Sequence, residues 1–208
     1  MQSIPYKLSE FFILFVLIPV SFAVTFPIWI KMVLGVLGFL YVIVVLLRVE
    51  KVKFRISKNL DWSSFFKRIL LQLAGIAALT TIYMWFVDKT NLFVVLLNKP
   101  ILWIIILFVY SFFSVYPQEL IYRTFYFKRY QNLFKDQYLF MFLNASVFSL
   151  AHLFFGNGLV IILTFVGGLL FAFTFKKTTS TLMVSVEHAI YGSWLFTVGM
   201  GSMLGFPS

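Results

Sequence analysis

The chain contains no cysteine, so disulfide bonds, thiolate catalysis and cysteine-based metal sites are excluded. Charged residues are also scarce, at 12% of the 208 residues, whereas a soluble domain carries about a quarter. Hydrophobic residues make up 62% of the sequence, and phenylalanine alone occupies 28 positions. This composition predicts an integral membrane protein whose residues 1–208 form a single domain, an all-α bundle of transmembrane helices.

Basic residues outnumber acidic ones, and the formal net charge is +10. They cluster at the ends of apolar stretches, where lysine and arginine set the orientation of membrane helices. We therefore expect membrane lipids, and not nucleic acid, to be the partners of the positive charge. No internal repeat, low-complexity tract or Gly/Ser linker is visible in the sequence.

Apolar stretches bounded by charged or turn residues predict about seven membrane spans. Pro27 separates the first two spans, Pro117 ends the fourth, and Gly156-Asn157-Gly158 predicts a tight turn after the fifth. The spans cover approximately residues 11–26, 28–47, 69–87, 101–116, 138–155, 159–175 and 181–203.

The first apolar stretch faintly resembles a signal peptide, because Lys7 precedes it and the small residues Ser21 and Ala23 end it. A second span follows almost at once, which favours a first helix that is retained.

Positive charge alternates along this series of spans and predicts the orientation of the chain. Asn59, Asp61 and Ser63 give the segment after the second span turn and capping character, and we interpret its basic residues as a topology anchor. The alternation places the N-terminus in the cytoplasm and the C-terminus outside, and we expect a bacterial plasma membrane. The basic residues on the cytoplasmic side are Arg48, Lys51, Lys53, Arg55, Lys58, Lys67, Arg68, Lys128, Arg129, Lys135, Lys176 and Lys177.

A few ionisable residues lie inside apolar stretches, where they are costly and usually functional. They include both histidines of the chain, His152 and His188, and the acids Glu119 and Glu187. Arg123 follows Glu119 by one helical turn, so the two side chains share a helix face and can pair. That pair is either a structural ion pair or part of a catalytic site.

The surroundings of the histidines suggest a cavity. His152 ends a helical row that includes Asn144 and Phe148, and Gly192 follows His188 by one turn, where another helix or a substrate backbone can approach closely. Glu187 can orient a histidine, pair with a basic group or remain protonated. The candidate substrate-binding residues are Asn144, Phe148, Glu187, Tyr191, Gly192 and Ser193.

A carboxylate and two imidazoles allow two chemistries. The carboxylate can act as general base on a water while histidine polarises the carbonyl or protonates the leaving amine. Alternatively, the three groups can bind zinc, although the HExxH motif is absent.

Three segments carry a resemblance to a known family. Gln118-Glu119-x-x-x-Arg123, Phe148-x-x-x-His152 and His188-x-x-x-Gly192 resemble, in order and separation, the motifs EExxxR, FxxxH and HxxxN of the CPBP family. This family comprises CAAX protease and bacteriocin-processing (Abi) intramembrane peptidases. The resemblance covers roughly residues 101–194 and implies a catalytic core over residues 101–204, preceded by N-terminal helices and a basic cytoplasmic segment in residues 1–100.

The resemblance implies cleavage of a peptide or lipidated peptide at the membrane, with no cofactor. In the family, a glutamate of the first motif activates water, the histidines assist, and the asparagine of the third motif stabilises the oxyanion. Carried over to this chain, Glu119 is the base beside Arg123, His152 orients the water or shuttles its proton, and His188 stabilises the oxyanion together with Gln118 or a backbone N–H group. Zinc remains the alternative.

Two residues depart from the family pattern. Gln118 stands where the family has its favoured glutamate, and an amide cannot take a proton from water at neutral pH. Gly192 stands where an asparagine is common, and Tyr191, Ser193 and Asn144 are candidate replacements for it.

Three explanations are open for the glutamine. Glu119 has taken over as base, the chain is a non-catalytic interaction or immunity protein that keeps the cavity, or it is an engineered inactive variant. A proton-coupled transporter is a further function, disfavoured because no repeat or broken helix is visible.

Overall fold

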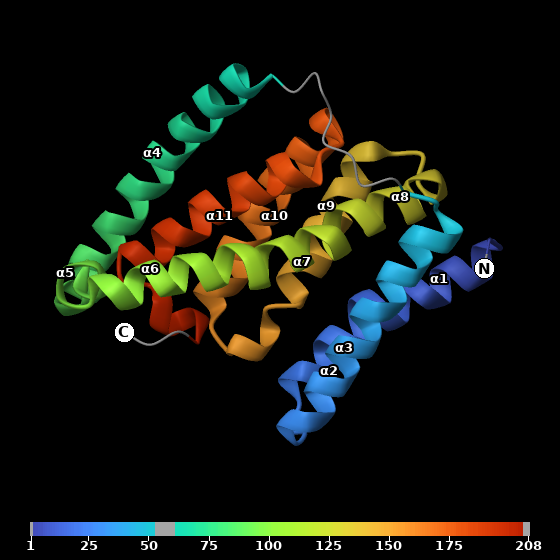
Figure 1. Ribbon diagram of the computed structural model, residues 1–208, viewed down its shortest axis with the longest axis horizontal. Coiled ribbons are helices and arrows are strands. Elements are labelled where there is room, and N and C mark those ends of the chain that lie inside the picture. Colours follow the sequence, from blue (N-terminus) through green and yellow to red (C-terminus); the bar gives the residue numbers. More distant parts are fainter. Residues whose placement is uncertain (1, 53–60, 206–208) are drawn as a thin grey trace. The chain divides into compact units, whose positions relative to one another are not determined.

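The computed structural model describes residues 2–52 and 61–205, which form helices and no strand (Figure 1). The prediction of an all-α polytopic helical bundle is confirmed. The chain divides into two compact units, each built from two separate stretches of sequence. Unit 1 comprises Met1–Arg55 and Glu119–Thr179, and unit 2 comprises Ile56–Gln118 and Ser180–Ser208. The predicted single domain, with a division near residue 100, stays a prediction.

Six helices within the described residues are long and apolar enough to cross a membrane. The seventh predicted span forms a shorter helix, α11 (Thr181–Thr197), whose 17 residues lie at the lower limit of about 17–25 for a transmembrane helix. The six longer helices cover Ile4–Ala23, Ile28–Val49, Trp62–Val87, Pro100–Leu133, Gln137–Phe155 and Gly158–Thr178.

Unit 1 contains the N-terminal helices and the helical hairpin that follows Glu119. Pro27 separates its first two spans as predicted. Asn157 caps the second helix of the hairpin by accepting hydrogen bonds from the Leu159 and Val160 amides, and Gly156 has a φ of 63°, which confirms the turn. The α-helices of this unit are α1 (Ile4–Phe12), α2 (Ile18–Ala23), α3 (Ile28–Val44), α8 (Tyr126–Tyr130), α9 (Gln137–Leu150) and α10 (Gly158–Thr178).

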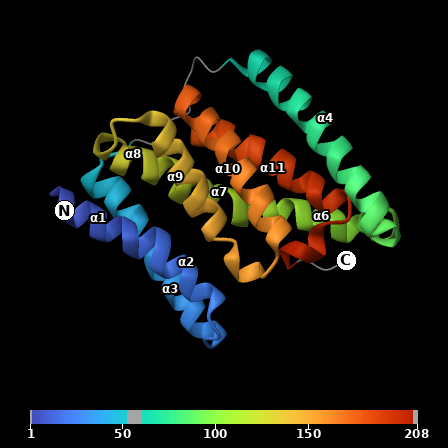
Figure 2. The same cartoon turned by 180° about the vertical axis from the view of Figure 1, so that it is seen from behind.

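Helices α9 and α10 lie side by side (Figure 2). Gly168 of α10 allows this close approach, because a Cβ at that position would lie 3.0 Å from the Cα of Ala145 on α9.

Unit 2 contains a long helix, a short turn and the helix that carries Glu187 and His188. Asp61 caps the long helix by accepting a hydrogen bond from the Ser64 amide, as its capping character predicted. After α11, Gly199 turns the chain with a φ of 104°, a conformation that favours glycine. The α-helices are α4 (Trp62–Val87), α5 (Val94–Asn98), α6 (Pro100–Val109) and α11, and α7 (Tyr116–Glu119) crosses the boundary between the units.

The helix that begins at Pro100 continues through Pro117 to Leu133, so the predicted end at Pro117 is wrong. A proline removes one backbone donor and its ring clashes with the preceding turn. Here a wider π-helical turn, η4 (Tyr110–Val115), lies just before Pro117. In the first span, too, a π-helical turn precedes a proline: η1 (Ile13–Leu17) lies before Pro19. A local π-helical adjustment is one way in which a membrane helix tolerates proline.

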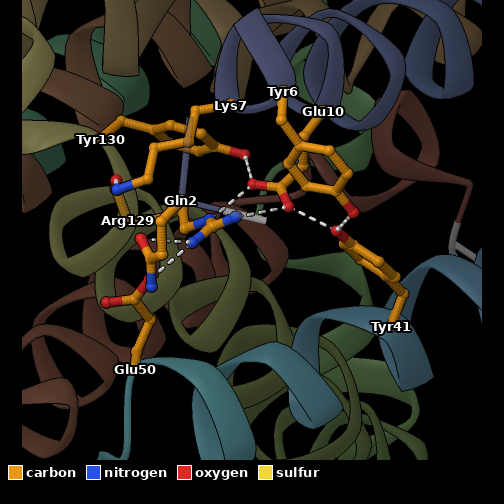
Figure 3. Close-up of polar contacts among 8 residues, drawn as sticks. All are labelled: Gln2, Tyr6, Lys7, Glu10, Tyr41, Glu50, Arg129 and Tyr130. Atoms are coloured by element: carbon orange, nitrogen blue, oxygen red, sulfur yellow. Dashed lines mark hydrogen bonds and ion pairs between the residues drawn. The ribbon is translucent and has the colours of Figure 1, made fainter. Parts of the chain in front are cut away.

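A buried charged cluster joins the N-terminal helices of unit 1 to α8 (Figure 3). The Arg129 guanidinium lies 2.7 Å from Glu10 Oε1 through Nε and 2.8 Å from Glu50 Oε1 through Nη1. The Tyr130 hydroxyl donates to Glu10 Oε1 at 2.8 Å, and the Tyr41 hydroxyl donates to Glu10 Oε2. Arg129 is therefore a buried partner of two acids, and its predicted place on the cytoplasmic side stays a prediction.

Other residues of the predicted topology anchor differ in environment. Lys53, Arg55, Lys58 and Asn59 lie outside the described residues. Lys128, Lys135, Lys176 and Lys177 are exposed, which is compatible with the predicted role. The predicted orientation of the chain stays a prediction.

Candidate functional site

Unit 1 places the first two motifs together around Arg123. Glu119 and Arg123 are both fully buried, and Glu119 Oε2 lies 3.5 Å from Arg123 Nε, so the predicted i, i+4 pair is present. The guanidinium lies over the ring of Phe148, 4.8 Å from its centroid, and over Phe171 on the hairpin. Its Nη2 donates to the carbonyl of Gly168 at 3.4 Å. Arg123 is thus held by aromatic faces, a carbonyl and one carboxylate.

Phe148 connects this pair to His152. Its ring contacts the imidazole, with 4.8 Å between ring centroids, and its carbonyl oxygen lies 2.8 Å from His152 Nδ1. A carbonyl only accepts, so Nδ1 carries the hydrogen and Nε2 is the nitrogen whose lone pair can take a proton. His152 lies two residues beyond the end of α9, in the turn before η7 (Leu153–Phe155), although its spacing from Phe148 predicts a helical position.

Asn144 is fully buried in the same unit. Its Nδ2 donates to the carbonyl of Tyr122 at 2.6 Å, and its Oδ1 has no hydrogen bond within the described part of the chain. Tyr122 also packs edge-on against Phe148, with 5.3 Å between centroids. Asn144 therefore supports the backbone next to Arg123, and its predicted role in substrate binding stays a prediction.

Unit 2 places Glu187 in a polar group between α4 and α11. Glu187 is fully buried, and its Oε1 lies 3.4 Å from Arg68 Nη1 and 3.2 Å from the Tyr191 hydroxyl. The Tyr191 hydroxyl also lies 2.8 Å from Gln72 Oε1. Pairing with a basic group, one of the three alternatives for Glu187, is observed. Arg68 is a partly buried counter-ion on α4, and its predicted role in the topology stays a prediction.

His188 and Gly192 face a tyrosine that the sequence analysis did not select. The His188 and Tyr110 rings meet edge to face, with 6.0 Å between centroids. A Cβ added to Gly192 would overlap the hydroxyl oxygen and Cζ of Tyr110. The predicted close approach at Gly192 is therefore present, and a phenol makes it. Helical periodicity does not indicate this contact, because it joins residues 82 positions apart in the chain.

Gln118 and Ser193 complete the predicted residues. The Gln118 Nε2 donates to Ser114 Oγ at 2.7 Å, one helical turn earlier. Its Oε1 is buried and has no hydrogen-bond partner among residues 2–52 and 61–205. Ser193 is partly buried, and its carbonyl accepts a hydrogen bond from the Thr197 hydroxyl at 2.8 Å.

The family comparison agrees with the motifs. A family model described as Rce1-like, type II CAAX prenyl endopeptidase, matches residues 100–205, which is half of the chain. The chain belongs to this Rce1-like family. No curated protein and no solved structure gives a match. At the level of the family, membership indicates a CAAX-type protease of the membrane, and it confirms the resemblance to CAAX peptidases.

All three motifs lie within the part of the chain that matches the Rce1-like family, whereas the helices α1 to α5 precede it. Glu119, Arg123 and His152 belong to unit 1, and Gln118, Glu187 and His188 belong to unit 2. A metal would need several ligands close together, and no group of three or more His, Asp or Glu side chains that could hold one occurs among the described residues. The cofactor prediction remains untested.

Proposed function

We propose that this Rce1-like protein is an intramembrane endopeptidase in which Glu119 activates the hydrolytic water. The observation that carries the proposal is a fully buried carboxylate beside a fully buried arginine, in the first motif of a family of CAAX prenyl endopeptidases. Gln118, the neighbouring motif position, has an amide that does not accept a proton at neutral pH. Glu119 is therefore the carboxylate of this motif that can act as base.

The proposed reaction is a direct hydrolysis. A water molecule gives one proton to the Glu119 carboxylate while its oxygen attacks the peptide carbonyl carbon, and the carbonyl oxygen takes the electron pair as an oxyanion. The C–N bond then breaks, and the leaving nitrogen receives the proton from Glu119, which restores the carboxylate. Arg123 keeps the Glu119 charge compensated in a buried environment.

Two histidines, His152 and His188, assist the proposed hydrolysis. His152 has its Nδ1 occupied by the Phe148 carbonyl, so its Nε2 can orient the water or relay a proton. His188, the third-motif residue, is proposed to stabilise the oxyanion. The proposed substrate is a peptide whose C-terminal region is anchored in the membrane, with a prenyl group as the lipid that the family description suggests.

The test uses purified full-length protein in detergent or lipid nanodiscs and a fluorogenic peptide with a farnesylated cysteine near its C-terminus. Glu119→Gln should lower kcat by about 10²–10⁴-fold, the range that a general base contributes. Asp88→Asn is the matched control, because it makes the same chemical change at a partly exposed position after α4, outside the three motifs, and should leave kcat unchanged. Cleavage in H₂¹⁸O should place one ¹⁸O atom in the new carboxylate.

Wild-type activity in Glu119→Gln would remove this residue as base and make Glu187 the next candidate. Stoichiometric metal in the active protein, with activity lost on chelation and restored on addition, would replace the metal-free mechanism by the zinc alternative.

A non-catalytic binding protein is the second candidate function, and the amide of Gln118 favours it. Under this alternative the wild type cleaves nothing, and Gln118→Glu gains cleavage. The same two measurements therefore separate an active protease from a degenerate or engineered inactive one.

A further inference from the structure

The first two membrane helices of unit 1, Ile4–Ala23 and Ile28–Val49, enclose an apolar groove. Its volume is about 340 Å³, and small-molecule sites in proteins measure about 300–1,000 Å³. Every residue that lines it belongs to unit 1, so the groove is defined within one compact unit. Its apolar walls consist of Ile13, Leu14, Ile18, Leu34 and Leu37.

A missing side chain creates part of this space. Gly38 lines the groove, and a Cβ at this position would lie 3.6 Å from Ile18 Cδ1 on the opposite wall. That distance is an ordinary contact, so alanine fits, whereas a large side chain would extend into the groove. The rims remain accessible, because Ile13 is 49% exposed and Leu37 is 59% exposed. A flexible apolar chain can therefore enter the groove from the side.

One end of the groove is polar (Figure 3). The Glu10 carboxylate only accepts hydrogen bonds, so the Tyr41 hydroxyl uses its single hydrogen there. The Tyr6 hydroxyl, 3.0 Å from that of Tyr41, is then the donor of the next bond. Ser9 adds a further hydroxyl to this end. An apolar channel that ends in hydroxyl groups fits a molecule with one apolar chain and a polar end.

The length of the groove matches one leaflet of a bilayer. Tyr6 at the polar end and Ile18 at the apolar end are 12 positions apart, or about 18 Å along a helix. The hydrocarbon core of a bilayer is about 30 Å thick, so one leaflet contributes about 15 Å. Tyrosine is enriched at the level where this core meets the headgroups, which agrees with Tyr6 and Tyr41 at the polar end.

Positive charge lies beyond the polar end. Arg48 and Lys51 follow Tyr41 by two to three helical turns, and both are exposed. Neither forms an ion pair within residues 2–52 and 61–205, whereas Glu10 and Glu50 both pair with Arg129. The two acids of the cluster are thus neutralised, and the two exposed cations remain to attract an anionic headgroup.

We propose that this groove binds one acyl chain of an anionic phospholipid. The ester linkage lies at the hydroxyls of Tyr6 and Ser9, and the phosphate lies near Arg48 and Lys51. A membrane lipid is the occupant because it surrounds these helices at a concentration that no substrate reaches. The lining residues also precede residue 100, where the Rce1-like match begins. The proposal does not depend on the peptidase function.

The first experiment measures binding to delipidated full-length protein in detergent by native mass spectrometry, with phosphatidylglycerol as the probe. The wild type should retain one lipid, and Gly38→Phe should weaken its binding at least about tenfold, because the ring overfills the groove. Gly38→Ala should bind as the wild type does, since its Cβ fits. Gly75→Phe on α4 is the matched control, because a Cβ there would meet no atom within 4 Å.

A second experiment locates the lipid and remains informative if Gly38→Phe does not fold. Phosphatidylglycerol with a diazirine in one acyl chain is reconstituted with the wild type in vesicles and activated by light. Labelling should concentrate on Ile13, Leu14 and Leu34, and exceed that of Phe86, an 82% exposed residue of α4. Replacing Arg48 and Lys51 by glutamine should weaken phosphatidylglycerol binding about fivefold per charge.

Each outcome decides a part of the proposal. Groove labelling no stronger than that of Phe86, or equal lipid binding in folded Gly38→Phe and wild type, overturns the site. A farnesylated peptide that displaces the lipid and labels the groove itself overturns the phospholipid as occupant. Unchanged binding in the double glutamine variant overturns the headgroup contact. None of these results changes the expected effect of Glu119→Gln on peptide cleavage.

Discussion

Replacement of Arg129 by methionine tests the contribution of the buried ion-pair cluster in unit 1. The arginine is 1% exposed, and its guanidinium contacts Glu10 through both Nε at 2.7 Å and Nη2 at 3.1 Å. A third contact, from Nη1 to Glu50, measures 2.8 Å. Methionine keeps much of the apolar stem but leaves the buried carboxylate of Glu10 without its cation.

Removing one partner of a buried ion pair costs about 3–5 kcal/mol, because the remaining charge is left uncompensated. For a chain of this size, 1 kcal/mol corresponds to about 2–4 °C in the melting temperature. Arg129→Met should therefore lower the transition by roughly 6–20 °C. Glu50→Gln should cost less, about 1 kcal/mol, because the Glu50 side chain is 17% exposed and Arg129 keeps Glu10.

The double variant Glu10→Leu with Arg129→Met removes both buried charges and is the critical comparison. Apolar replacement of a whole buried ion pair is often neutral or stabilising, so this variant should recover at least about half of the loss. Thermal unfolding followed by tryptophan fluorescence in detergent measures all four proteins. If Arg129→Met melts within about 2 °C of the wild type, or if the double variant is the less stable of the two, the reasoning from uncompensated charge is wrong.

Three further predictions concern unit 2, and each is measured by thermal unfolding. Gly192→Ala should lower the free energy of unfolding by about 2 kcal/mol, because the new Cβ overlaps Tyr110. In a chain that already carries Tyr110→Ala, Gly192→Ala should have no such cost; if the costs of the two substitutions simply add, the contact between the two residues is contradicted. Arg68→Ala should cost about 2 kcal/mol, reduced from the fully buried case because the Arg68 side chain is 24% exposed, and adding Glu187→Gln should recover part of it. Gly199→Ala should cost roughly 3 kcal/mol, because φ is 104° and a Cβ would overlap a backbone oxygen; a wild-type transition would exclude this backbone conformation.

Local features of the fold were predictable because their causes lie within a few residues. The apolar stretches predict the spans, and Asp61 and Asn157 cap their helices through hydrogen bonds from amides two or three residues later. The Glu119 and Arg123 pair follows from helical geometry alone. The continuation of the helix through Pro117 was not predictable in the same way, because the π-helical turn before it has no distinct sequence pattern.

Features that depend on partners far away in the sequence were not predictable from local patterns. Arg129 is adjacent to Lys128, and two basic residues at a helix end have the pattern of a topology signal. Its acidic partners Glu10 and Glu50 lie 119 and 79 positions away. Tyr110 was missed for the same reason, since an aromatic residue in an apolar span is usually core. Its importance follows only from the missing side chain at Gly192.

The Arg129 cluster also bears on how much of the chain a stable fold needs. The Rce1-like match starts at residue 100 and includes Arg129, but both counter-ions of this arginine come from helices that precede the match. A fragment trimmed to the matched segment would lack Glu10 and Glu50, two carboxylates that pair with the buried guanidinium of Arg129. The first 50 residues therefore supply two carboxylates that pair with a buried arginine of the matched segment, so we expect both parts of the chain to be needed for stable folding.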